Sequence, residues 1–276
     1  MPLVNLYTLL DFLREKKTIA PAFNTTNLET TLAIMEGLND SGYPGIIQIT
    51  PKNLELSGYE FIAEITKIAG QKFDVPIVLH LDHGKTFEDI KKAIQAGFGS
   101  VMIDGSDLDF EENIKLTKRV KEYCRCFNIP VEAELGAIGG KEDDQITENN
   151  KTDPSLVEEF VRKSGCDLLA VSVGNVHGLQ DEPNIDLNLL KQISEVSPVP
   201  LVIHGGSGIP LEIIRKLREF NVIKINIASE IRKAFIQTVG KFYEDNRNEY
   251  NLVKVLIQAK KAVRDIVASK TRSINS

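Results

Sequence analysis

Three histidines in this sequence are placed to bind one catalytic metal ion. His83 and His177 each follow a short apolar run, and His204 lies on another, so all three fall at the ends of predicted strands. Three neutral imidazoles with one open position form the ligand set expected of catalytic rather than structural zinc. We therefore predict one Zn²⁺ held by these side chains. The fourth histidine, His80, suits a hydrogen-bonding role in the core better and is left out of the ligand set.

Acids and amides occur at the ends of the predicted strands as well. They are Asn24, Gln48, Asp82, Asp104, Glu134 and Asn226. Any one of them alone would more often be a hydrogen-bonded polar residue of the core or rim. So many at the same end of successive strands indicate an active site, because those ends converge in space. We expect Asp104 and Glu134 either to orient the histidines or to bind an alternative metal position.

Two turns after late strands have the composition of a phosphate site. HGGSG runs from His204 to Gly208, and NIAS runs from Asn226 to Ser229. Glycines allow backbone amides to approach an anion, and the positive end of a helix beginning near Pro210 would add to the attraction. In barrel enzymes, the loops after the seventh and eighth strands commonly bind phosphate. We therefore predict a phosphorylated small-molecule substrate.

The elements that must position these residues alternate along the chain. Short β-branched runs begin at Ile19, Gly45, Pro76, Ser100, Pro130, Leu168, Pro200 and Val222. Helical patterns between them begin at Leu28, Leu54, Phe87, Phe110, Pro154, Leu187 and Pro210. Eight strand–helix units predict an α/β fold, a single (β/α)8 TIM barrel spanning residues 1–276 with extra C-terminal helices. A doubly wound open sheet is the alternative.

Composition excludes several functional classes. The 276 residues are 42% hydrophobic and 26% charged, as in a globular protein with a full core. A formal charge of −6 argues against a general nucleic-acid binder, and no run approaches the roughly 20 apolar residues of a membrane span. The N-terminus lacks the basic-then-apolar order of a signal peptide, and three cysteines without CxxC spacing favour a reducing, cytoplasmic location.

One long polar segment, from Gly139 to Pro154, interrupts this regular alternation. It reads GGKEDDQITENNKTDP and begins with glycines. Loops of this length inside a compact domain are often functional lids, and a plain surface loop is the other interpretation.

The whole set of motifs resembles the class II, metal-dependent ketose-bisphosphate aldolases, which act on fructose or tagatose bisphosphate. The resemblance covers essentially the whole chain. It rests on IAPAFN, VLHLDHG, VEAELGAIGGKED, AVSVGNVHG, LVIHGGSGIP and KINIASE, in the order and spacing of that family. It implies reversible cleavage of a ketose phosphate, with fructose 1,6-bisphosphate as the leading substrate, into dihydroxyacetone phosphate and an aldehyde such as glyceraldehyde 3-phosphate.

The resemblance also implies roles for individual residues. The zinc ligands fall on His83, His177 and His204, and a second divalent position falls on Asp104 and Glu134. Asp82 matches the acid/base at the aldehyde oxygen, and Glu142, on the long polar segment, matches the carboxylate that moves the enediolate proton. The residues expected to hold substrate and its phosphate are Asn24, Gly178, Gly205, Ser207, Asn226, Ala228, Ser229 and Arg232.

Further expectations come from the same resemblance. A monovalent cation, Na⁺ or K⁺, is expected at carbonyls near Gly178 and Gly205. The chain is expected to form a homodimer or homotetramer, with the C-terminal helices near the interface.

Two departures bear on the substrate. Val253 stands where the family usually has an arginine that reaches the neighbouring subunit's distal phosphate, and a valine offers no charged bidentate contact. Lys254 could replace that arginine after a small shift. Thr50 replaces a serine that is usual in the family, and Ala228 matches tagatose-type members, so fructose and tagatose substrates both stay open.

Two other functions are consistent with the residues alone. Three histidines would also serve a metal-dependent hydrolase or isomerase with a zinc-activated water. A phosphosugar-binding protein without activity is the third reading, although the complete set of predicted catalytic residues disfavours it.

Overall fold

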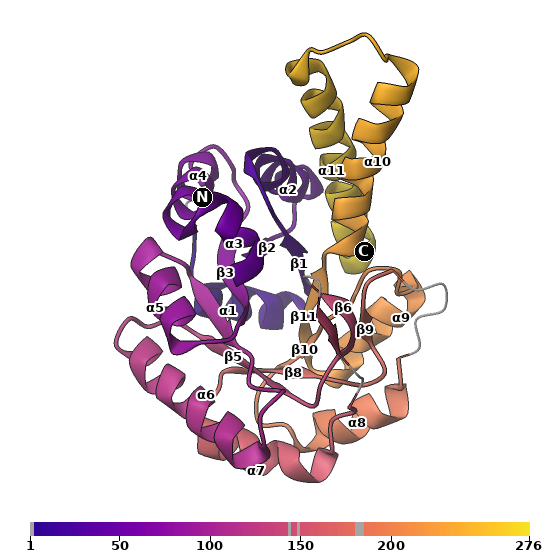
Figure 1. Ribbon diagram of the computed structural model, residues 1–276. Coiled ribbons are helices and arrows are strands. Elements are labelled where there is room, and N and C mark those ends of the chain that lie inside the picture. The colour runs from indigo at the N-terminus through magenta and orange to yellow at the C-terminus, as the bar shows by residue number, and fades with distance from the viewer. Residues whose placement is uncertain (1–2, 143–144, 148–149, 180–184) are drawn as a thin grey trace.

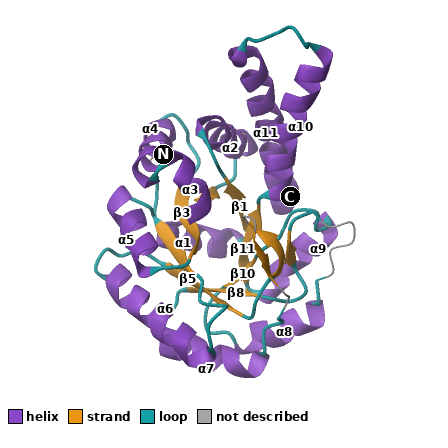
Figure 2. Cartoon of the chain, viewed as in Figure 1, coloured by secondary structure: helices purple, strands orange, loops and turns teal. Residues whose placement is uncertain are grey.

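A computed structural model of the chain describes residues 3–142, 145–147, 150–179 and 185–276, without the side chains of 141–142 and 145–147. In these residues, eight parallel strands close into a barrel inside a ring of helices (Figures 1 and 2). The strands are β1 (Ala20–Asn24), β2 (Gly45–Ile49), β3 (Ile77–Gly84), β4 (Ser100–Ile103), β5 (Val131–Leu135), β8 (Leu168–Val171), β10 (Leu201–Ile203) and β11 (Val222–Ile227). Each corresponds to one predicted run. The closed barrel is therefore confirmed over the open sheet.

The helices follow the strands as the sequence pattern predicts. They are α2 (Leu28–Ser41), α3 (Pro51–Ser57), α4 (Tyr59–Gly70), α5 (Phe87–Ala96), α6 (Phe110–Arg125), α7 (Pro154–Ser164), α8 (Leu187–Val196), α9 (Leu211–Lys216), the 3₁₀ turn η1 (Leu217–Phe220), α10 (Ser229–Asp245) and α11 (Leu252–Asn275). The single stretch expected from Leu54 is two helices. Thr50 caps α3 by accepting from the Asn53 amide, and Gly58, with φ of 76°, ends this helix before α4 begins.

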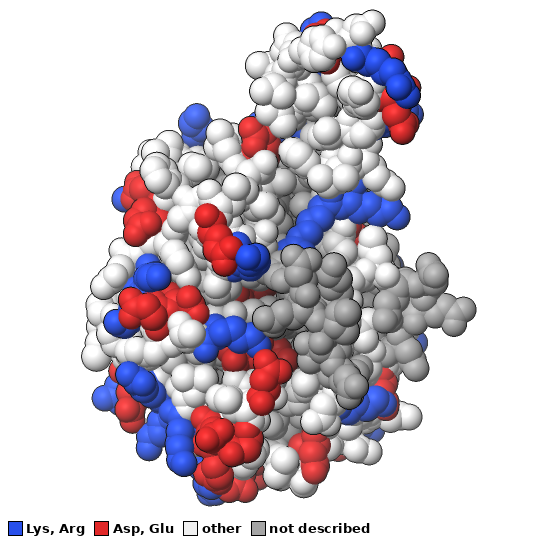
Figure 3. Space-filling model, viewed as in Figure 1, with Lys and Arg blue, Asp and Glu red and all other residues white. Residues whose placement is uncertain are grey.

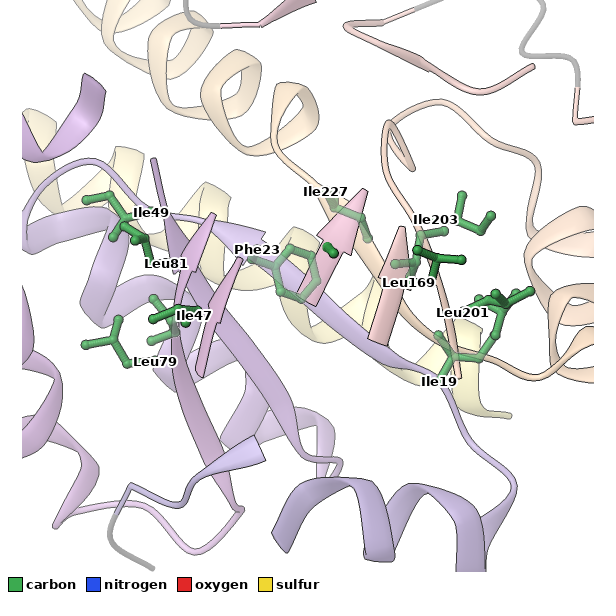
Figure 4. Packing of buried hydrophobic residues seen from close by; sticks show 14 of the residues in the cluster. Ile19, Phe23, Ile47, Ile49, Leu79, Leu81, Leu169, Leu201, Ile203 and Ile227 are labelled. Carbon is green, nitrogen blue, oxygen red and sulfur yellow. The ribbon is translucent and has the colours of Figure 1, made fainter. Parts of the chain in front are cut away.

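Alternate residues of the barrel strands face different surroundings. Ile47 and Leu79 belong to a cluster that packs outward against the helices (Figure 4). Ile46 and Val78, one position earlier, belong to a second cluster with Leu9 of helix α1 (Leu6–Lys16). Since successive side chains of a strand point to opposite faces, the second cluster fills the interior of the barrel. Helix α1 closes this apolar, N-terminal end.

The inward positions change character toward the C-terminal ends of the strands. Gln48 comes two residues after Ile46, and His80 and Asp82 come two and four residues after Val78; all three polar side chains are buried. This is the arrangement by which a barrel gathers polar groups from many strands at one end. The polar residues that the sequence places at strand ends therefore lie together at the C-terminal end of the barrel.

The last two helices form a hairpin that projects away from the barrel (Figure 1). Its large exposed apolar side chains are Ile236, Tyr243, Tyr250, Leu252, Val253 and Ile257. On the face shown in Figure 3, the hairpin is mostly uncharged, with charges along its outer edge. Among the described residues, no helix is both long enough and apolar enough to cross a membrane.

A small second sheet lies at the mouth of the barrel and corrects the prediction of an irregular segment between Gly139 and Pro154. Strands β6 (Gly139–Glu142) and β7 (Gln145–Thr147) pair antiparallel, and β6 also pairs parallel with β9 (Val176–His177). A Cβ on Gly140 would come within 2.3 Å of the His177 carbonyl oxygen, so glycine allows this close pairing. The polar segment is therefore tied by its backbone to His177.

Candidate active site

The three histidines predicted as metal ligands lie together at the polar end of the barrel. The ring centroids of His83 and His204 are 4.7 Å apart, and those of His83 and His177 are 5.3 Å apart. One donor atom from each histidine can be chosen so that all three lie within 4.8 Å of one another. The spacing suits three ligands of one ion, and His80 belongs to neither of the candidate metal groups found among the described residues.

An irregular backbone at the end of β3 makes this convergence possible. His83 has φ of 48°, in the left-handed region, and the pairing of β3 with β4 shifts register between Leu81 and Gly84. In a regular strand the consecutive residues Asp82 and His83 would point to opposite faces. Here the side chains of Asp82 and His83 both form hydrogen bonds at the mouth of the barrel, with Asn24 and Asp104 respectively. Such backbone strain is uncommon for a residue with a Cβ and tends to occur at functional sites.

The hydrogen bonds of the histidine rings determine which nitrogens face one another. His83 Nδ1 lies 2.8 Å from Asp104 Oδ2, and His204 Nε2 lies 2.9 Å from Glu132 Oε1. Because carboxylates accept, these outer nitrogens carry the protons. Burial, and to a smaller extent the nearby His83, hold the pKa of His204 well below its ordinary value. The ring is therefore neutral at physiological pH.

His83 Nε2 and His204 Nδ1 then face each other at 2.9 Å. In neutral rings protonated on the outer nitrogens, both of these atoms carry lone pairs. Two facing lone pairs repel, and a cation beside them converts that repulsion into attraction. His177, whose pKa burial also lowers strongly, completes a set of three imidazole donors. The residues present therefore fit a zinc ion.

Sequence reasoning missed a second buried network behind His204. Glu132 Oε2 accepts from Lys224 Nζ at 2.9 Å while its Oε1 contacts His204, and all three side chains are buried. His80 Nε2 lies 3.6 Å from Glu132 Oε2, and His80 Nδ1 is within 2.9 Å of Ser100 Oγ. His80 is thus a hydrogen-bonded core residue, as expected. The signal for Glu132 was its position two residues before Glu134 on a strand, which places both acids on the inward face.

Asp82 lies at the centre of three side-chain amides. Asn24 and Gln48 donate to Oδ2 at 2.8 and 3.0 Å, and Asn226 donates to Oδ1 at 3.1 Å. Burial alone would raise the pKa of Asp82, but His83, His204 and Lys224 bring it below the ordinary value. The carboxylate is therefore ionised and rigidly held beside the histidines, which suits a general base.

Asp104 and Glu134 form a second candidate metal group together with His83. Their donor atoms also lie within 4.8 Å of one another. Glu134 Oε2 is 3.9 Å from His204 Nδ1, and Asn175 donates to the His204 carbonyl at 3.1 Å. Both candidate groups share His83, so an ion in one of them competes with an ion in the other for this ring.

A pocket beside His177 contains every residue that was expected to hold substrate. It is lined by Asn24, His177, Gly178, Gly205, Ser207, Asn226, Ala228, Ser229 and Arg232. Gly205 has φ of 63°, and a Cβ there would lie 2.0 Å from the Val176 carbonyl oxygen, so only glycine fits. Sites lined in this way by glycines, serines and an arginine favour anions.

The helix end at this pocket differs from the predicted one. Residues of α9, which begins after Pro210, do not line the pocket; the start of α10 does, through Ala228, Ser229 and Arg232. Ala228 provides no side-chain cap for α10, and the Glu230 amide donates instead to Ser207 Oγ, another residue of the pocket wall, at 3.3 Å. The positive end of the helix thus lies at the pocket. The helix end at this pocket therefore belongs to α10, which follows β11, the eighth strand of the barrel.

Other predicted residues lie elsewhere. Glu142 closes strand β6 at the mouth, and its side chain lies outside the described residues. Val253 is 65% exposed at the start of α11, and Lys254 is ion-paired with Glu249. The pocket beside His177 and the hairpin position of Val253 are thus separate regions of the chain.

Comparisons with known proteins agree with this architecture. The model of the class-II fructose-bisphosphate aldolase family matches residues 4–276. A protein of Bacillus subtilis named as a probable fructose-bisphosphate aldolase is 36% identical over 281 aligned positions, which cover 100% of this chain and 99% of that protein. A fructose-bisphosphate aldolase of Staphylococcus epidermidis is 35% identical over 281 positions, covering 100% of this chain and 98% of that protein.

Among solved structures, the YdjI aldolase of Escherichia coli K12 superposes with a TM-score of 0.86 at 29% identity, covering 99% of this chain and 97% of that one. Agreement in family model, sequence and fold extends over nearly the whole chain. The chain belongs to the class-II fructose-bisphosphate aldolase family and is a carbon–carbon lyase.

Proposed function

We propose that the enzyme uses one zinc ion to cleave a phosphorylated ketose reversibly into dihydroxyacetone phosphate and an aldehyde. The observation that carries this proposal is the pair of facing ring nitrogens on His83 and His204, with His177 beside them. When bound there, zinc supplies a Lewis acid that polarises the ketose carbonyl and stabilises the negative charge left by bond cleavage. Asp104 and Glu132 orient the two facing rings from their outer nitrogens.

Asp82 is the proposed acid/base. In the cleavage direction its carboxylate accepts the proton of the C4 hydroxyl as the C3–C4 bond breaks, and in synthesis it returns that proton to the aldehyde oxygen. The amides of Asn24, Gln48 and Asn226 hold the carboxylate in place. Glu142 is the proposed carrier of the C3 proton of the dihydroxyacetone half, on the strength of the family resemblance.

The phosphate of the dihydroxyacetone half is proposed to bind at the start of α10. Gly178, Gly205, Ser207 and Ser229 supply small, polar walls there, and Arg232 supplies a positive charge. Asn24 and Asn226 connect this pocket to Asp82, so phosphate binding positions the sugar against the acid/base. A monovalent cation at carbonyls near Gly178 and Gly205 remains part of the proposal.

The distal end of the substrate is proposed to be weakly selected. Val253 carries no charge, and the neighbouring Lys254 is held by Glu249, so neither offers a ready partner to a second phosphate. Fructose 1,6-bisphosphate is the leading substrate, and tagatose 1,6-bisphosphate or a ketose 1-phosphate is the alternative.

The projecting hairpin is the proposed subunit interface of a homodimer or homotetramer. It exposes six large apolar side chains, and extensive exposed apolar surface marks protein–protein interaction sites. Sedimentation equilibrium would test this part of the proposal, and a monomer at micromolar concentration would contradict it.

The central experiment is a retro-aldol assay of metal-stripped and zinc-reloaded enzyme. Fructose and tagatose 1,6-bisphosphates and their 1-phosphates would be compared, with triose phosphate formation as the readout. We expect zinc-dependent formation of triose phosphate and similar turnover of fructose 1-phosphate and the bisphosphate. Loss of ketose without triose phosphate would indicate an isomerase or hydrolase instead. A thousandfold preference for the bisphosphate, about 4 kcal/mol, would reject weak distal selection.

A further inference from the structure

The ammonium group of Lys85 lies against the same carboxylate that orients His83. Lys85 Nζ is 2.8 Å from Asp104 Oδ2 and 3.1 Å from Asp107 Oδ2. The Asp104 side chain is only 4% exposed, whereas that of Lys85 is 42% exposed, so the lysine reaches inward from the rim. Lys85 follows Gly84 at the end of β3, two residues after His83. A fixed positive charge is thus built in next to the metal donors.

Protein donors occupy all the accepting positions of Asp104. The backbone N and the Oγ of Ser106 donate to Oδ1 at 3.1 and 2.7 Å. His83 Nδ1 and Lys85 Nζ lie 2.8 Å from Oδ2. A carboxylate offers about four lone-pair sites. These four donors therefore leave Asp104 without an open position for a metal ion.

The charges around Asp104 also disfavour a metal ion on this carboxylate. The Lys85 ammonium forms ion pairs with both Asp104 and Asp107, at 2.8 and 3.1 Å. A divalent ion on Asp104 would have to displace the ammonium or remain beside it, and like charges at that separation repel.

From this geometry we infer that Lys85 takes the place of a second cation and restricts each chain to one divalent ion. Of the two candidate metal groups, the one made by His83, Asp104 and Glu134 is closed by Lys85, and the three-histidine group stays open. This inference rests on the proposed zinc site. Lys85 is a positioning residue that acts through Asp104 on His83, keeping the His83 proton on Nδ1 and its other nitrogen toward His204.

The test counts metal ions in the intact enzyme. Metal-stripped wild type, Lys85→Gln and Lys85→Ser would be dialysed against excess zinc and then freed of loose metal, and bound zinc per chain would be measured by mass spectrometry. We expect one zinc per chain for the wild type and a second, more weakly held ion in both variants. Cobalt loading gives an independent readout, because an ion bound by His83, Asp104 and Glu134 has a different ligand set from one bound by three histidines and therefore changes the visible spectrum.

Two matched variants separate this effect from general loss of surface charge. Lys85→Arg keeps a cation over Asp104, and Lys151→Gln removes a lysine of a comparable rim pair, with Asp186 at 2.9 Å. Both are expected to bind one zinc. The inference is overturned if the wild type binds two ions, or if folded Lys85→Gln and Lys85→Ser both bind one. Wild type that binds no zinc would instead refute the proposed function.

Discussion

The two ends of the barrel both contain an acid surrounded by donors, but only one end is built to react. At the N-terminal end, Asp167 accepts from Tyr7 at 2.8 Å, from Lys121 at 2.5 Å and from the Val131 amide at 2.8 Å. Each donor there has its acceptor, and helix α1, which carries Tyr7, closes the end. The network connects α1, α6 and the starts of two strands, so it stabilises the fold.

At the C-terminal end, the donors and acceptors are not matched in this way. His83 and His204 donate hydrogen bonds to Asp104 and Glu132, and their remaining nitrogens face each other. The proposed metal ion would bind both of these nitrogens and remove the mismatch. The comparison shows that a buried charged network indicates function when its polar atoms converge on a shared space, and indicates structure when they satisfy one another.

Removing a proposed metal ligand from the C-terminal end of the barrel should have the largest effect on activity. His204→Ala should lower kcat by about 10⁴ or more, because a catalytic metal supplies several kcal/mol and each tenfold in rate corresponds to about 1.4 kcal/mol. Treatment with EDTA should have a similar effect on the wild type, and added zinc should reverse it. Activity that survives both treatments would refute the metal mechanism.

Replacing the proposed acid/base should give the next largest effect. Asp82→Asn keeps the shape of the side chain and its neighbours but removes the base, so kcat should fall about a thousandfold, within the usual range for general acid–base catalysis. Zinc content per chain should stay unchanged. A parallel loss of zinc would mean that Asp82 holds the site together rather than moving a proton.

Glu132→Gln tests the network that orients His204. A side chain hydrogen-bonded to a metal ligand typically contributes 10- to 100-fold, so zinc affinity should fall by about that factor. Competition with a chromogenic chelator would measure it. Lys121→Gln, at the opposite end, serves as the control with unchanged affinity. If the zinc affinity of Glu132→Gln equals that of the wild type, Glu132 has no role in orienting the ligand.

Asp167→Asn probes the structural end. The pair with Lys121 is partly exposed, so its loss should lower the free energy of unfolding by about 1–2 kcal/mol, less than for a fully buried pair. Urea unfolding measures this change. The kcat and zinc content should stay at wild-type values, and a large loss of activity in the folded variant would contradict the division between the two ends.

The smallest expected effect concerns pH. Burial, and to a smaller extent the charge of Lys224, hold the pKa of His80 well below the ordinary value of about 6.5. The unfolded chain therefore binds a proton below pH 6.5 that the folded chain does not, and stability is lost as the pH falls through this range. Between pH 7 and 5.5, metal-free wild type should lose about 1 kcal/mol more than His80→Asn. Equal pH slopes in urea unfolding would show that His80 is not kept neutral by the fold.

The sequence predicted the closed barrel and the location of its reactive end. Eight apolar runs alternating with helices require a covered parallel sheet, and polar residues at the ends of those runs must converge. It failed where a local backbone detail decided the outcome, as at Gly58 between α3 and α4 and in the pairing of β6 with β9. The sequence also led us to expect the helix that begins near Pro210 at the anion site, whereas the pocket beside His177 is lined by the start of α10 and not by α9.

Residue types and spacing by themselves therefore predicted the fold class, the family and the convergence of His83, His177 and His204. Only the tertiary structure showed that Glu132 lies behind His204, 72 positions away, and that Lys85 fills the last accepting position of Asp104. The physical reason is that hydrogen bonds depend on which atoms face one another across the barrel. The sequence gives the order of the residues, but the closure and stagger of the strands determine which side chains become hydrogen-bond partners.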